Sequence, residues 1–162
     1  MIYYKTAEEI EKLRASNQLV SKTLAEIARV IRPGITTDEI NKIADEYIRD
    51  HGATPAFLGY SGFPKSICTS VNSQVVHGIP SEYVLNEGDV LSVDCGVVLD
   101  GYVGDSAYSY AVGEVSKEKS ELMRVTREAL FLGVENAVSG KRIGDIGFAI
   151  QHYCEKHGYG VV

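Results

Sequence analysis

The chain has 162 residues, of which 44% are hydrophobic and 23% charged, and its formal net charge is −6. This length and composition are those of a soluble globular protein with a core of its own. No run of Lys or Arg could follow a phosphate backbone, and no apolar stretch approaches the ~18 residues of a membrane span, so we expect neither nucleic-acid nor membrane partners. The three cysteines form no Cys-x-x-Cys pair, which favours reduced thiols and a cytoplasmic location.

The first fifty residues predict two helices with recognisable ends. The pattern Thr6-x-x-Glu9 is a capping box, and apolar residues follow it at helical spacing as far as Ile31. The pair Pro33-Gly34 ends this helix. A second capping box, Thr36-x-x-Glu39, begins a helix with one apolar face that stops at His51-Gly52.

Residues 53–113 change in character and predict short strands. They are rich in Gly, Pro, Val and Tyr, and the strand-like runs are "SICTSV", "QVVHGI", "DVLSVDCGVVL" and "YVGDSAYSYAV". Helical patterns return over about 116–137 and 143–157. We therefore predict an αβ part over residues 1–113 and a helical part over residues 114–162.

The helical patterns repeat at a distance of 106 residues. The shift aligns Leu24 with Leu130, Gly34 with Gly140, Ile40 with Ile146, Tyr47 with Tyr153, and His51-Gly52 with His157-Gly158. Tandem amphipathic helices are common, so coincidence is the alternative to duplication. If the duplication is real, the second copy lacks the strands that follow the first, and we expect the sequence to be a fragment.

Two aspartates in "VDCGVVLDGYVGD" are the strongest candidates for chemistry. Asp100-Gly101 between apolar runs predicts a tight hairpin, with Leu99 opposite Tyr102. Asp94 and Asp105 then lie on one face and diagonal to each other, about 7–8 Å apart at Cα. Two such carboxylates repel unless a proton or a cation lies between them, and a pair of divalent metals is a natural bridge. The alternative is that one aspartate belongs to the turn and the other faces water, and a one-residue bulge would also move the two to opposite faces.

Two further stretches offer candidates with weaker signals. His77 in "VVHGIP" ends an apolar run before a turn, where a histidine is more often structural than catalytic. The stretch "GYSGFPKSICTSVN" gathers Tyr60, Phe63 and Cys68. These three residues pack as ordinary core or line a small apolar pocket, since sulfur and aromatic edges suit a thioether side chain.

Taken together, "GYSGFPKSICTSVN", "VVHGIP" and "GDVLSVDCGVVLDGYVGD" closely resemble the methionine aminopeptidases of the bacterial, type I kind. The resemblance runs from about Thr6 to Val162. It implies an α+β class and the pita-bread fold, whose two pseudo-symmetric αβ halves agree with the repeat. On this basis the first half is complete in residues 1–113, and the second is reduced to its helices in residues 114–162.

The resemblance also implies a site and an activity. The complete enzyme would use two divalent metal ions (Co, Mn, Fe or Zn) to activate a water that releases the N-terminal methionine of peptides and nascent chains. Asp94 and Asp105 match metal ligands, and His77 matches a histidine that hydrogen-bonds the substrate. Tyr60, Phe63 and Cys68 match the lining of the methionine pocket, with Phe63 where relatives often have tyrosine.

The rest of the family's ligand set has no counterpart in this sequence. One histidine and two glutamates that complete the metal shell, and a second histidine near the substrate, come from the second half in the family. We therefore expect this chain to bind metal weakly or not at all, and to self-associate through surfaces that the missing half would cover. The alternatives are an inactive pita-bread binding module or truncated paralogue, and a proline-directed relative of the prolidase type.

Overall fold

The computed structural model describes residues 3–162, and its first two helices begin at the two predicted capping boxes. Helix α1 spans Ala7–Val30 and helix α2 spans Thr37–Asp50. The Thr6 hydroxyl accepts the Glu9 amide at 3.2 Å, and the Glu9 carboxylate accepts the Thr6 amide at 2.8 Å. Thr36 and Glu39 form the same reciprocal pair. Both predicted helix starts are confirmed, because each cap satisfies backbone donors that a helix leaves open.

A four-stranded antiparallel sheet follows, and every strand in it pairs with β3. The strands are β1 (Thr54–Pro55), β2 (Ile67–Val71), β3 (Val90–Leu99) and β4 (Tyr102–Ala111), with a 3-10 turn η1 at Tyr60–Gly62. Strand β4 pairs with β3 along its whole length, whereas β1 and β2 pair with different stretches of β3. The two-residue β1 was not among the predicted strands, because a pair of residues carries no readable alternation.

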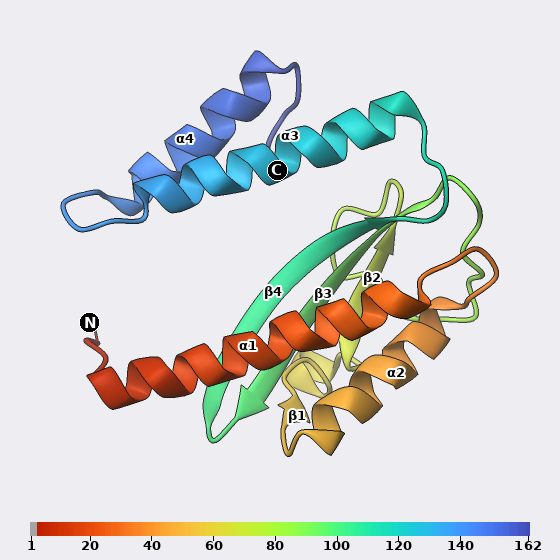
Figure 1. The fold of residues 1–162 in the computed structure, drawn as a ribbon, viewed down its shortest axis with the longest axis horizontal. Helices are drawn as coiled ribbons and strands as arrows, with labels where there is room; N and C mark the ends of the chain where they lie inside the picture. Colours follow the sequence, from red (N-terminus) through yellow and green to blue (C-terminus); the bar gives the residue numbers. More distant parts are fainter. Residues whose placement is uncertain (1–2) are drawn as a thin grey trace. The chain divides into compact units, whose positions relative to one another are not determined.

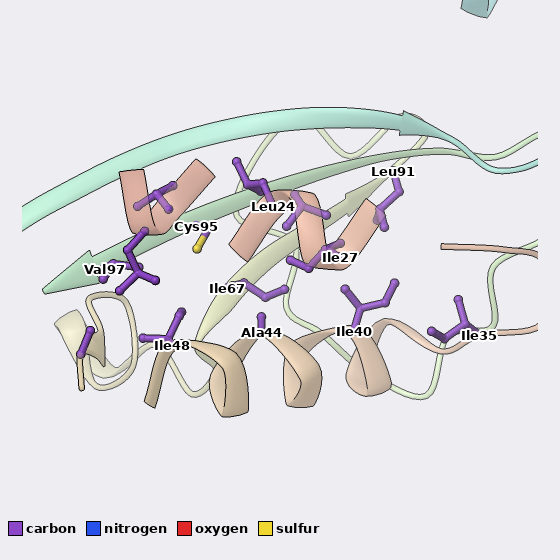
Figure 2. Close-up of a cluster of buried hydrophobic side chains, with 14 of the residues drawn as sticks. Leu24, Ile27, Ile35, Ile40, Ala44, Ile48, Ile67, Leu91, Cys95 and Val97 are labelled. Carbon is purple, nitrogen blue, oxygen red and sulfur yellow. The ribbon is translucent and has the colours of Figure 1, made fainter. Parts of the chain in front are cut away.

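The core lies between this sheet and the first two helices. Helix α1 packs against β3 and β4, and helix α2 packs against β1 and β2 (Figure 1). Figure 2 shows Ile40, Ala44 and Ile48 of α2 pointing toward Ile67 of β2 and Ile27 of α1. All five side chains are fully buried, and each large aliphatic one contributes roughly 2–3 kcal/mol. The two helices therefore cover one face of the sheet, and the side chains of the opposite face remain available to form a site.

The prediction of a strand in "QVVHGI" is wrong. Residues 74–79 form a loop in which Val75 and Val76 are exposed and His77 has φ = 58°. A positive φ turns the chain out of the extended region. The loop is fixed at Gly78, whose carbonyl accepts the Thr69 amide at 2.8 Å and whose amide donates to the Ser70 hydroxyl at 3.1 Å. Apolar composition alone did not reveal this bent path.

By their internal contacts the described residues form two units, the first ending at Val115 and the second running from Ser116 to Val162. The second unit contains α3 (Lys117–Asn136) and α4 (Ile143–Lys156), so both predicted helices are confirmed. They pack at Gly133, where an added Cβ would lie 2.8 Å from the Ile150 side chain. None of the helices in the described part of the chain has the length and apolar run that a membrane crossing needs.

The predicted internal repeat is confirmed in the bounds of the helices. Helix α4 begins and ends 106 residues after α2, and α3 ends 106 residues after α1. The two copies also end alike, because the imidazole Nδ1 atoms of His51 and His157 lie 2.8 and 2.9 Å from the carbonyl oxygens of Tyr47 and Tyr153. Each histidine is followed by a left-handed glycine. The same local chemistry therefore terminates both helices.

Candidate functional site

The β3–β4 hairpin brings the two candidate aspartates to one face. Asp100 and Gly101 have φ values of 50° and 80°, as a tight hairpin turn requires, and Leu99 pairs with Tyr102. Asp94 lies opposite Ala107, and Asp105 lies opposite Gly96. The register predicted from the Asp-Gly turn is therefore confirmed, with no bulge between the two positions. Side chains at paired and diagonal positions of one parity point to the same face.

A close approach of α1 fixes the Asp105 end of the hairpin. At Gly104 an added Cβ would lie 2.6 Å from the Asn17 amide nitrogen, so only glycine lets the helix backbone come this near. The Asn17 side-chain oxygen accepts the Asp105 amide at 3.3 Å, and the Ser16 hydroxyl donates to the Tyr102 carbonyl at 2.9 Å. These bonds tie β4 to the helix on either side of Gly104, which orients the Asp105 backbone.

A cavity of about 800 Å³ opens over this face of the hairpin. Its lining consists of Ala56, Phe57, Tyr60, Ser61, Gly62, Phe63, Pro64, Cys68, His77, Ile79, Asp94, Val98, Val103 and Asp105. All six residues selected from the sequence are in this set. The cavity is therefore mostly apolar, with a carboxylate pair and one imidazole as the groups that can carry charge near neutral pH, the usual composition of a small-molecule site.

Several apolar lining residues were not selected from the sequence, among them Phe57, Ile79, Val98 and Val103. Val98 and Val103 have the same strand parity as Asp94 and Asp105, so the argument that placed the aspartates on one face could have found them. Phe57 and Ile79 carry no such signal. Phe57 enters because its ring fills the space beside Gly96, where an added Cβ would lie 2.5 Å from the ring. That contact depends on the tertiary fold alone.

The carboxylate pair is electrostatically unfavourable without a counter-charge. Burial and the neighbouring Asp105 carboxylate, which also shares a side-chain hydrogen bond with Asp94, raise the pKa of Asp94 to about 6. The charge of His77 and a hydrogen bond from the Cys95 amide lower this pKa, but they do not outweigh the first two causes. Asp94 therefore binds a proton more tightly than an ordinary aspartate does, and a divalent cation beside the pair could take the place of that proton.

The two cysteines near the pair are unreactive thiols rather than ligands. Burial, followed by the charges of Asp94 and Asp105, raises the pKa of Cys68 to about 11 and that of Cys95 to about 12. All three cysteines of the chain are free, as the sequence predicted. Because the thiolate is the metal-binding form, Cys68 is better suited to apolar contact in the cavity wall.

The donor set fits a divalent cation only in part. Two carboxylates on one hairpin suit a divalent metal such as Mn, Fe, Co or Zn, and the raised pKa of Asp94 marks a place for positive charge. Within residues 3–162, however, there is no group of three or more His, Cys, Asp or Glu side chains that could hold a metal ion. These residues therefore offer part of a coordination shell.

Comparison with known proteins places the chain in a family. The model of metallopeptidase family M24 matches residues 11–162. The chain belongs to family M24. A methionine aminopeptidase of Clostridium acetobutylicum is 49% identical over 163 aligned residues, and the match covers 100% of this chain and 65% of that protein. This M24 chain thus spans less than two thirds of the length of that relative.

Solved structures of M24 proteins agree with this assignment. The crystal structure of methionine aminopeptidase from Rickettsia prowazekii superposes with a TM-score of 0.98 at 44% identity, covering 100% of this chain and 65% of that one. A Xaa-Pro dipeptidase from Bacillus anthracis gives 0.84 at 28% identity, covering 96% and 42%. The α+β, pita-bread class inferred from the resemblance is therefore confirmed. The higher identity lies with the methionine aminopeptidases rather than with the proline-directed branch.

Proposed function

We propose that this M24 chain carries part of the machinery for metal-dependent removal of the N-terminal methionine from peptides and nascent proteins. The observation that carries the proposal is the placement of Asp94 and Asp105 on one face of a rigid hairpin, in the same cavity as His77. The naming of its relatives as methionine aminopeptidases supports the substrate class.

In this proposal Asp94 and Asp105 would hold the divalent metal ions, which would supply the means to make a water nucleophilic at neutral pH. The hairpin holds both carboxylates at fixed separation, so little reorganisation is needed when a cation binds. His77, at the edge of the same cavity, donates a hydrogen bond to the substrate near the scissile amide. Its loop, fixed at Gly78, places the exposed His77 in the lining of the same cavity as the carboxylates.

The apolar part of the cavity would receive the methionine side chain. Phe63 and Tyr60 supply aromatic edges, and Cys68 supplies a polarizable, protonated sulfur. Thioethers make favourable contacts with both groups. Phe57 and Ile79 extend the same wall, and none of these residues offers a charge that would favour a polar side chain.

The proposal is tested by calorimetric titration with Mn²⁺ or Co²⁺ together with hydrolysis of a methionyl peptide. We expect weak metal binding that Asp105→Ala abolishes, and any hydrolysis to be lost in the same variant. Asp100→Asn is the matched control, because Asp100 lies in the exposed turn of the same hairpin and asparagine tolerates its φ of 50°. Equal binding by Asp105→Ala and the unchanged chain would contradict the proposal.

A binding function without catalysis is the second candidate. It is favoured by the absence, within residues 3–162, of any group of three or more His, Cys, Asp or Glu side chains placed to hold a metal ion. Binding of a methionyl peptide without hydrolysis, unaffected by a chelator, would support it over the first.

We also infer that the second unit associates with other copies of the chain. Leu130, which is 56% exposed, stands 106 residues after Leu24, which is 7% exposed under the sheet of the first unit. Phe131, Val134 and Phe148 are likewise exposed. Apolar patches of this kind favour association. Sedimentation showing a monomer at all concentrations would contradict it, and Phe148→Ser should weaken any association observed.

A further inference from the structure

A buried carboxylate lies outside the cavity and is not used by the proposed chemistry. Asp89, only 7% exposed, stands just before β3 and accepts hydrogen bonds at both of its oxygens. Its Oδ1 accepts the Asn72 side-chain amide at 2.8 Å, and its Oδ2 accepts the Tyr83 hydroxyl at 3.3 Å and the Asn86 amide at 2.9 Å. Burying a carboxylate costs folding free energy unless its oxygens accept hydrogen bonds, as those of Asp89 do.

The donors around position 89 require a hydrogen-bond acceptor at both terminal atoms of its side chain. Only an ionised Asp or Glu presents two acceptor oxygens and no donor. An asparagine at position 89 could accept the two bonds at the Oδ2 position. Its NH₂ group would then face the NH₂ group of Asn72, and a buried donor would meet a donor.

The partners of Asp89 stand at the two ends of the loop that carries His77. Asn72 follows β2 directly, and its own side-chain oxygen accepts the Val90 amide at 3.1 Å. Tyr83 stands near the other end of the loop. The Asp89 carboxylate thus links both ends of the loop to the beginning of β3, the strand that also carries Asp94.

His77 needs such a hold because its backbone conformation is unfavourable. Its φ of 58° lies in the left-handed region, which few residues other than glycine adopt. Such a conformation persists only where the surroundings over-determine it. Within the loop the nearest restraints are the two bonds between Gly78 and strand β2. Farther along, the Thr37 hydroxyl donates to the Ser81 carbonyl and accepts the Ser81 amide, both at 2.9 Å.

We propose that the Asn72–Asp89 pair is the positioning element of His77, holding its loop in the conformation that keeps the imidazole at the cavity. Asp89 touches neither the cavity nor a reacting atom, so it is a positioning residue and not a catalytic one. The inference rests on the role proposed for His77, but its structural content can be tested without metal or peptide.

The test is an exchange of the two side chains. Asp89→Asn places donor against donor, and Asn72→Asp places carboxylate against carboxylate. The double variant Asn72→Asp/Asp89→Asn restores every hydrogen bond given above with the roles of the two residues reversed. Asparagine and aspartate both tolerate the φ of 51° at position 72. Rescue in the double variant would show that the pair, and not the bulk of either residue, holds the loop.

The readouts are local. Amide exchange at Gly78 and Thr69 reports the attachment of the loop to β2, and the carbon–proton signal of the His77 ring reports its surroundings. We expect each single variant to accelerate exchange at these two amides by roughly tenfold or more. The His77 signal should shift in both, and the double variant should return both readouts to the unchanged values. Amides of the β3–β4 pairing serve as the control for global stability.

Tyr83→Phe is a milder variant that removes only one donor and leaves the Asn72–Asp89 contact in place. We expect an acceleration of about threefold at Gly78 and Thr69. If the single variants accelerate exchange equally at Gly78 and in the β3–β4 pairing, with no shift of the His77 signal, the pair is merely structural and the inference fails. Failure of the double variant to rescue would also overturn it.

The outcome can be separated from that of the proposed function. Absence of hydrolysis in the unchanged chain would leave the exchange and ring signals intact, so it would contradict the aminopeptidase proposal alone. Where hydrolysis is measured, Asp89→Asn should lower kcat more than it raises KM, and the double variant should recover kcat. A displaced His77 signal with unchanged kcat would overturn the link between this pair and the reaction.

Discussion

Replacing Asp94 by asparagine should stabilise the metal-free chain at neutral pH. Burial and the Asp105 carboxylate raise the pKa of Asp94 from its ordinary value of 3.8 to about 6. Each pKa unit is worth about 1.4 kcal/mol, so the charged form of Asp94 costs the folded state roughly 3 kcal/mol at most. Partial exposure to solvent reduces this to roughly 1–2 kcal/mol. The asparagine side chain carries no charge and avoids this cost.

The pH dependence gives the sign of the effect. Below pH 3.8 the carboxyl of Asp94 is protonated in both the folded and the unfolded chain, so the unchanged chain and the Asp94→Asn variant should have similar stability. Between pH 3.8 and 6 the folded chain binds more protons than the unfolded chain, so its free energy of unfolding falls as pH rises. Above pH 6 Asp94 is ionised in the folded chain as well, so its charge destabilises the fold by the full amount. Asp94→Asn should therefore be more stable than the unchanged chain at pH 7, and the difference should vanish once the pH falls below 3.8.

The measurement is urea unfolding in the presence of a chelator, across this pH range. The chain contains no tryptophan, so far-ultraviolet circular dichroism is the suitable probe. Asp100→Asn, in the exposed turn, is the control and should not reproduce the effect. Excess Mn²⁺ should stabilise the unchanged chain more than Asp94→Asn, because the cation replaces the missing counter-charge. An Asp94→Asn chain that is equally stable or less stable at pH 7 would refute the reasoning.

Three further outcomes follow from individual contacts. Gly104→Ala should lower the free energy of unfolding by roughly 2–3 kcal/mol, because its Cβ meets the Asn17 backbone; unchanged urea midpoints would contradict this. Cys68 in the native chain should react with iodoacetamide at pH 8 roughly a hundredfold more slowly than a free thiol, since its pKa is raised to about 11; rapid alkylation seen by mass spectrometry would argue against it. Tyr110→Phe should cost about 1 kcal/mol by removing the 2.7 Å bond to the Leu24 carbonyl, measured by thermal unfolding against Tyr108→Phe.

Local signals in the sequence determined the helices and the hairpin. A capping box links residues three apart, and the Asp100-Gly101 turn pairs Leu99 with Tyr102 across two residues. Patterns on this scale are legible because each residue's partner lies within a few positions along the chain. The placement of Asp94 and Asp105 on one face follows from that turn and the period of a strand. The repeat of the helices is also readable in the sequence, because each helix carries its own local pattern of apolar residues and end signals.

Only the tertiary structure decided which residues line the cavity and how the pKa values of its side chains are shifted. The strand predicted in "QVVHGI" is a loop because Gly78 bonds to β2, and Asp89 holds the loop from beyond its other end. Gly104 is required by a helix backbone more than eighty residues earlier in the chain. The raised pKa of Asp94 depends on burial in the folded chain and on the Asp105 carboxylate of the neighbouring strand. Contacts between residues distant in the sequence leave no periodic trace, so the folded chain alone specifies them.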